Sequence, residues 1–165
     1  MAQNQPVKAI DVIPSDTINI PQPGSVVGGN SSTNGTTLTD ASATFLADSI
    51  SGGDVVYAQA AGPVGPEIHE ILSVDDGQTI TLKTAVAAGA PYAYKIYKGN
   101  GGELKEGFDG YSLFVGTAGD VAVLPVGTGQ DEVILKNVAN NSYVPLQVQR
   151  VLDSGTTAAD ILALE

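Results

Sequence analysis

The sequence predicts an all-β fold: an antiparallel β-sandwich or barrel with an inserted small β-barrel or meander. The 20 glycines and 9 prolines interrupt the 165 residues too often for long helices. The apolar runs between them are short and rich in β-branched residues, which favour strands. In the run 144–149, Val144, Leu146 and Val148 alternate with proline or glutamine, as in a half-buried strand.

One further segment predicts a hairpin. Residues 111–123 read YSLFVGTAGDVAV, in which a Gly-Thr-Ala-Gly-Asp turn separates two apolar stretches. A single helical turn is expected only at 42–48. We expect strands at 7–13, 17–20, 36–38, 54–59, 67–74, 79–83, 92–97, 111–115, 120–124, 132–138, 144–152 and 160–164.

Glycine and proline clusters divide the chain into three segments. Residues 24–99 lie between a Pro-Gln-Pro run and a glycine-rich run, and we interpret them as an inserted β-module. Residues 1–23 are too few to fold alone, so we expect them to pair with residues 100–165. Residues 1–23 and 100–165 would then form one discontinuous β-sandwich.

The inserted module has its own alternating pattern. Ile68, Leu72 and Val74 are expected to face a common core, together with Glu70, the polar residue of this set. Glu70 either lies at a sheet edge or indicates that the strand has a different register.

Composition limits the classes of function. Hydrophobic residues make up 42% of the chain, which argues against disorder. Aromatic residues are 5% and Trp is absent, so the core is expected to be aliphatic. Charged residues are 15%, below the roughly 25% typical of soluble domains. Two interpretations follow: a surface buried against partners, or a polar β-protein with an ordinary surface.

The charge balance excludes two kinds of partner. A net charge of −11 and seven scattered basic residues leave no basic patch for nucleic acid or an anionic membrane. An acidic shell also suits the outside of a DNA-filled container. Cysteine is absent, so disulfides, thiolate zinc sites and cysteine nucleophiles are excluded.

No segment is expected to direct the chain into a membrane. The first residues lack the basic and apolar regions of a signal peptide. The apolar runs are far shorter than the roughly 20 residues that cross a bilayer. We expect the chain to be made in a cytoplasm and to stay soluble.

The central residues resemble a β-module of bacteriophage structural proteins. The matching segments are TLTDASATF at 37–45, GDVV at 53–56, ILSVDDGQTITL at 71–82 and YKIY at 94–97. Each segment is a weak signal alone, and their order and spacing carry the resemblance.

The outer residues resemble the spike-base proteins on the heads of tailed phages and gene transfer agents. The matching segments are AIDVIPSD at 9–16, YSLFVGTAGDVAV at 111–123, VPLQVQRVL at 144–152 and GTTAADILAL at 155–164. Phe114 stands where the family usually has tyrosine, and the shortest members lack the central block.

These resemblances imply a structural virion protein and not an enzyme. It would decorate or cement the capsid exterior, or form the base of a head spike or fibre, after assembly in the host cytoplasm. The implied partners are the major capsid protein, further copies of the same chain and a head fibre protein, with no nucleic acid, membrane or cofactor. A tail or baseplate component is the alternative. A carbohydrate-active β-domain is more remote, because the chain lacks a Trp platform and an evident acid pair.

The residues offer few candidates for chemistry. His69 is the single histidine and lacks a nucleophile-elbow motif, so a structural role is favoured over catalysis. The glycine-rich runs 26–30 and 99–102 lack the helix and lysine of a phosphate loop and are expected to be flexible hinges.

Several acidic residues could in principle hold Ca²⁺ at a subunit interface, although ordinary turn chemistry explains them better because no EF-hand pattern occurs. They are Asp75, Asp76, Asp109, Asp120, Asp131 and Glu132.

Arg150 is the candidate interface residue. It follows Val144, Leu146 and Val148 on the same predicted side of its strand. An arginine in this position either ends the strand or forms a paired contact, since its planar fork binds carboxylates in two-pronged fashion. We favour a structural ion pair within the subunit or the oligomer.

Overall fold

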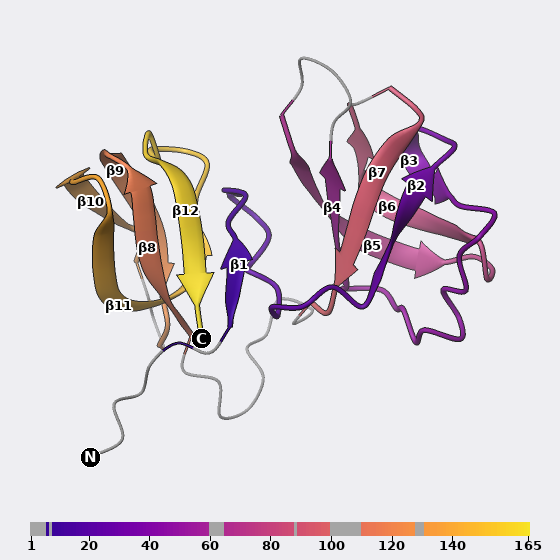
Figure 1. The fold of residues 1–165 in the computed structure, drawn as a ribbon, viewed down its shortest axis with the longest axis horizontal. Coiled ribbons are helices and arrows are strands. Elements are labelled where there is room, and N and C mark those ends of the chain that lie inside the picture. The colour runs from indigo at the N-terminus through magenta and orange to yellow at the C-terminus, as the bar shows by residue number, and fades with distance from the viewer. Residues whose placement is uncertain (1–5, 7, 60–64, 88, 100–109, 128–130) are drawn as a thin grey trace. The chain divides into compact units, whose positions relative to one another are not determined.

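The computed structural model confirms the all-β fold class (Figure 1). It describes residues 6, 8–59, 65–87, 89–99, 110–127 and 131–165. Within these residues the chain contains strands, turns and bends, and no helix. The strands are β1 (Ala9–Asp11), β2 (Val27–Ser31), β3 (Gly35–Thr39), β4 (Val55–Gln59), β5 (Glu67–Val74), β6 (Thr79–Val86), β7 (Tyr92–Tyr97), β8 (Tyr111–Thr117), β9 (Gly119–Pro125), β10 (Val133–Val138), β11 (Ser142–Val151) and β12 (Ala159–Leu164).

The chain divides into two compact units, each built on one six-stranded antiparallel sheet. Unit 1 contains residues 1–23 and 104–165, and unit 2 contains residues 24–103. The first division follows the Pro-Gln-Pro run directly. The second falls among residues outside the described part of the chain.

The sheet of unit 1 has the strand order β1-β12-β8-β11-β9-β10. One face of this sheet carries a row of fully buried aliphatic side chains, among them Leu113, Val115, Val123 and Val148. Period-two alternation places them together, because every second residue of a strand shares a face. Leu146 is only half-buried, and a β-bulge lies between residues 144 and 148 of β11.

The N-terminal segment joins this sheet, as expected. β1 pairs with β12, with Ala9 opposite Leu164. Beyond β1 the chain continues across the same unit: the Ile20 amide donates to the carbonyl of Gln149, and the Tyr111 hydroxyl donates to the carbonyl of Pro21 at 2.9 Å. Unit 1 is therefore completed by residues from both parts of the sequence.

The prediction of a strand at 17–20 is wrong, since the structure has no strand there. The Ser15 hydroxyl oxygen accepts hydrogen bonds from the amides of Thr17 and Ile18, which fixes a turn at the start of this segment. Side-chain to backbone bonds of this kind compete with strand pairing.

Unit 2 has the strand order β2-β7-β4-β5-β6-β3. A backbone hydrogen bond from Ser32 to Thr39 joins the ends of the two outermost strands. The core combines aliphatic residues with aromatic ones, and it includes Phe45, Tyr92 and Tyr94. The expectation of a largely aliphatic core therefore fits unit 1 better than unit 2.

Of two local expectations for unit 2, one is wrong and one is confirmed. Residues 26–30 were expected to be a flexible hinge, but β2 occupies 27–31 and pairs along its whole length with β7. The single helical turn expected within 42–48 is present, because the Asp48 amide donates to the Thr44 carbonyl four residues earlier. The remaining glycine-rich residues, 100–102, lie outside the described part of the chain.

The register expected for β5 is wrong by one residue. The buried side chains are His69 and Ile71, whereas Leu72 is 57% exposed and Glu70 forms an ion pair with Lys83 at 2.5 Å. A one-residue change moves every side chain to the opposite face of a sheet. A bulge after Ile71 then restores the inward position of Val74, which packs against the core.

We expect Val148→Ala to lower the free energy of unfolding of unit 1 by about 1–3 kcal/mol, because it leaves a cavity in a fully buried site. Gln147→Ala, on the exposed face of the same strand, is the matched control and should change stability by less than about 0.5 kcal/mol. Urea unfolding followed by far-UV circular dichroism measures both variants. Equal effects would contradict the assignment of the buried face of β11.

Candidate functional site

The segments that resemble spike-base proteins meet within unit 1. We call the meeting point the motif junction. It is formed by side chains of the N-terminal segment, the β8–β9 hairpin, β11 and the loop before β12. Its members are Asp16, Asn19, Asp120, Arg150, Ser154, Thr156 and Thr157.

Asp16 binds the loop that follows β11. One carboxylate oxygen accepts the Ser154 amide at 2.9 Å, and the other accepts the Ser154 hydroxyl at 2.7 Å. These two hydrogen bonds, with a smaller contribution from the positive charge of Arg150, lower the pKa of Asp16 below its ordinary value. The ionised carboxylate therefore holds together two segments that lie 138 residues apart in sequence.

Arg150 binds the same N-terminal segment from β11. Its Nε donates to the Asn19 side-chain oxygen at 2.9 Å, and one terminal nitrogen donates to the Asp16 carbonyl at 2.8 Å. The ion pairs among the described residues do not include Arg150. The bonds of this half-buried guanidinium lie within the chain, and its role at an interface stays a prediction.

Asp120 forms the other half of the motif junction. The Asp120 amide donates to the Thr157 hydroxyl at 2.9 Å, and the Asp120 carbonyl accepts a hydrogen bond from the Thr157 amide at 2.8 Å. Its carboxylate accepts the Lys136 ammonium at 2.7 Å and the Asn137 amide at 2.9 Å. These bonds, that from Lys136 first, lower the pKa of Asp120.

The side chains of the motif junction hold loops in place and do not form a reactive centre among themselves. Its carboxylates accept backbone amides, and its hydroxyls and guanidinium bind backbone or amide groups of neighbouring loops. Such bonds fix loop conformation, because each satisfies a polar group that strand pairing leaves open. These segments carry the resemblance in the sequence, but the hydrogen bonds between Asp16 and Ser154 were not predicted from it. Their separation in sequence gives no signal of the contact.

His69 lies inside unit 2 and is 5% exposed. Its Nδ1 lies 2.8 Å from the Thr84 hydroxyl. Its Nε2 lies 3.4 Å from a Glu67 carboxylate oxygen, within ion-pair distance but without hydrogen-bond geometry. Burial lowers the pKa of His69, and the Glu67 carboxylate only partly opposes this effect. These contacts fit the favoured structural role.

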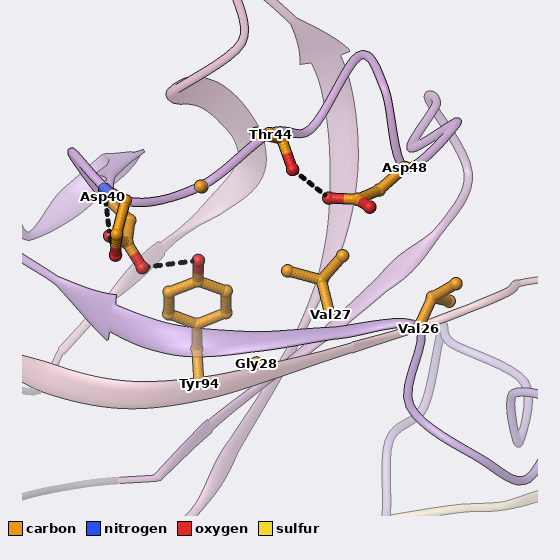
Figure 2. A pocket seen from close by; sticks show the side chains of 9 residues that line it. Val26, Val27, Gly28, Asp40, Thr44, Asp48 and Tyr94 are labelled. Atoms are coloured by element: carbon orange, nitrogen blue, oxygen red, sulfur yellow. Dashed lines mark hydrogen bonds between the residues drawn. The ribbon is translucent and has the colours of Figure 1, made fainter.

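A shallow hollow opens beside β2 and β7, with a volume of about 290 Å³ (Figure 2). The carboxylate of Asp40 lies at its edge and accepts hydrogen bonds from the Tyr94 hydroxyl, the Asn30 amide and both the amide and hydroxyl of Ser42. Burial opposes ionisation of Asp40, but these hydrogen bonds outweigh it and lower its pKa. At 290 Å³ the hollow is near the lower limit of ligand pockets.

Gly29 shows why this part of unit 2 is so closely packed. A Cβ atom at this position would lie 2.1 Å from the Asp40 carboxylate and 2.9 Å from the Tyr94 hydroxyl. The strand can approach the Asp40–Tyr94 pair only because residue 29 has no side chain. Asp40 is therefore a structural anchor for the loop that follows β3, a role that sequence reasoning did not assign.

Two of the acidic residues considered for Ca²⁺ have partners within the chain, as the favoured turn interpretation expects. Asp75 accepts hydrogen bonds from Ser73 of β5 and Thr81 of β6, the two strands that its turn joins, and Asp120 binds Lys136. Asp109 lies outside the described part of the chain. In that part, no group of three His, Cys, Asp or Glu side chains is placed to hold a metal ion.

The described residues also contain no helix long and apolar enough to cross a membrane. Comparison of the chain with known protein families, with curated proteins and with solved structures finds no match.

We expect Arg150→Lys to loosen the N-terminal segment, because lysine keeps the charge but cannot present the same planar pair of donors. The Ile20 amide, which donates to the Gln149 carbonyl next to Arg150, should exchange with solvent roughly tenfold faster. Hydrogen exchange followed by NMR measures the rate, with the Val56 amide of unit 2 as internal control. An unchanged rate at Ile20 would show that the guanidinium does not hold this segment.

The lowered pKa of His69 predicts how stability depends on pH. The unfolded chain, in which histidine has a pKa of about 6.5, takes up a proton more readily than the folded chain. Stability is therefore full above pH 6.5 and falls as the pH drops from 6.5 towards the folded-state pKa. Urea unfolding at pH 7.5 and 5.5 should show this loss in the natural chain and a smaller loss in His69→Gln. An equal loss in both would assign the effect to other groups.

Proposed function

We propose that this chain is a structural virion protein of a tailed phage, which decorates or cements the capsid exterior or forms the base of a head spike or fibre. It acts by binding and not by catalysis. The observation that carries this proposal is the motif junction. The segments that resemble spike-base proteins are distant in sequence, yet they meet through side-chain hydrogen bonds in one β-unit.

The motif junction supports the resemblance for a physical reason. A chance match of short segments would give no cause for their polar residues to be partners. Here Asp16 of the PSD segment binds Ser154 next to the GTTA segment, and Asp120 of the Gly-Asp hairpin binds Thr157 within it. The matched residues therefore have the roles expected of fold determinants, which is how a family keeps recognisable motifs in a protein without an active site.

The surface chemistry supports an exterior location. A net charge of −11 would repel packaged DNA and favour basic surfaces on a partner such as the major capsid protein. Further copies of the chain and a head fibre protein are the other proposed partners. Many identical weak contacts on a capsid lattice would together give tight attachment.

Purified particles from cells that express the chain test the proposal directly. Mass spectrometry should find the chain in the particles, and immunogold electron microscopy should place it on the head. Label on the tail or baseplate would favour the alternative location. Particles without the chain would overturn the proposal in both forms.

We expect the amount of the chain on particles to fall with Val148→Ala and to stay nearly unchanged with His69→Ala. Val148 supports the sheet of unit 1, where the spike-base resemblance lies, whereas His69 is buried in unit 2. Quantitative mass spectrometry relative to the major capsid protein gives the occupancy. Normal occupancy with His69→Ala, together with the loss of a hydrolytic activity of the particle, would favour an enzyme instead.

A further inference from the structure

β10 differs from the other strands at the edges of the two sheets. Among the strands of the described residues it pairs only with β9, so the other side of its backbone has no partner strand in that part of the chain. The other edge strands are short or polar: β1 has 3 residues, β2 reads VGGNS and β3 reads GTTLT. β10 reads VILKNV and is the longest of the four. A longer apolar edge is a template for pairing with another strand.

The first half of β10 is also exposed on both faces of the sheet. Val133 is 41% exposed and Ile134 is 46% exposed, and adjacent residues of a strand point to opposite faces. Ile134 lies on the same face as Ala122 of β9, its register partner, and as Lys136 two positions later. Single exposed apolar residues are common, but two consecutive ones on an open edge mark a contact surface.

A bulge closes the second half of the same edge. The register with β9 shifts between residues 135 and 138, and Asn137 adopts a left-handed conformation with φ of 53°. The Asp120 carboxylate accepts the Asn137 amide at this point. Bulges of this kind twist a strand away from further pairing. The open part of the edge therefore ends at Lys136.

The charges around the open part are self-complementary. Residues 132–136 read Glu-Val-Ile-Leu-Lys, with an acid and a base placed symmetrically about Ile134. In an antiparallel pair with a two-fold axis at Ile134, Glu132 of each strand faces Lys136 of the other, and Ile134 faces Ile134. Alternation along an extended strand places these three side chains on one face of the joined sheet, with Glu132 directly before the start of β10. Opposite charges and apolar residues placed directly across a strand pair stabilise it.

We propose that a second copy of this chain pairs with β10, in a two-fold antiparallel β10–β10 contact centred on Ile134. This contact joins the sheets of two copies of unit 1 into one continuous sheet. Glu132 is exposed and has no ion pair among the described residues, so its carboxylate is available. The Lys136 side chain is 63% exposed and can reach a second carboxylate beside Asp120.

The inference specifies the self-association within the proposed function but rests on the strand alone. A dimer of the purified chain can be measured without any particle. Failure of the β10 contact would leave attachment to a capsid untouched, and absence from particles would leave the dimer untouched.

Sedimentation equilibrium of the full chain provides the test. We expect a dimer for the natural sequence. Glu132→Lys places two lysine pairs across the axis, and Lys136→Glu places two glutamate pairs there. Each variant alone should dissociate with a constant raised about tenfold or more. Asp11→Lys, a change of an exposed charge on β1 at the opposite edge of the same sheet, should leave the constant unchanged.

A mixture of the two variants distinguishes this register from any other. When one chain carries Glu132→Lys and the other Lys136→Glu, both cross-strand pairs again join opposite charges. The mixture should therefore form a heterodimer of near-natural affinity, although neither variant dimerises well alone. Circular dichroism of each variant verifies that it is folded. A monomeric natural chain, single variants that dimerise normally, or a mixture that fails to recover would each overturn the proposal.

Discussion

Unit 1 depends on the attachment of its N-terminal segment to strands from the far end of the sequence. Residues 8–22 have no sheet of their own, and β1 has only 3 residues. Their structure comes from the pairing of β1 with β12 and from the hydrogen bond of the Tyr111 hydroxyl to Pro21. It also comes from the hydrogen bonds that join Asp16 to Arg150 and to Ser154. Because a short isolated strand is unstable in water, these contacts decide whether the segment is ordered.

The same constraint explains why polar residues matter more in this fold than their number suggests. The sheet of unit 1 is built by aliphatic burial, which is strong but not directional. Loops that must return to the sheet need directional bonds, and Asp16, Asp120 and Arg150 supply them. In unit 2, Asp40 does the same for the loop after β3, with Gly29 leaving room for the contact. A chain with few charged residues thus places several of them where they fix loops.

The fold class and most strand positions could be predicted from the sequence, because alternation and turn residues are local signals. The strands at 67–74 and 92–97 are confirmed at both ends. The register of β5 could not be predicted from the sequence, because its buried face includes His69 and a bulge follows Ile71. β2 was missed since its glycines are typical of a turn, and their value appears only beside Asp40 and Tyr94. The partnership of Asp16 with Ser154 is a tertiary contact between distant residues, so no local pattern reveals it.

The pairing of β1 with β12 has a consequence for synthesis on the ribosome. The residues of unit 2 are complete once residue 103 has emerged, so this unit can fold early. Unit 1 cannot close until Leu164 has emerged to pair with Ala9. At about 5–20 residues per second, synthesis of the roughly 155 residues between Ala9 and Leu164 takes about 8–30 seconds. During that interval β1 lacks β12 and the Ile20 amide lacks the Gln149 carbonyl. The nascent chain is then most prone to aggregate. Slower folding is the general result when contacts join residues far apart in sequence.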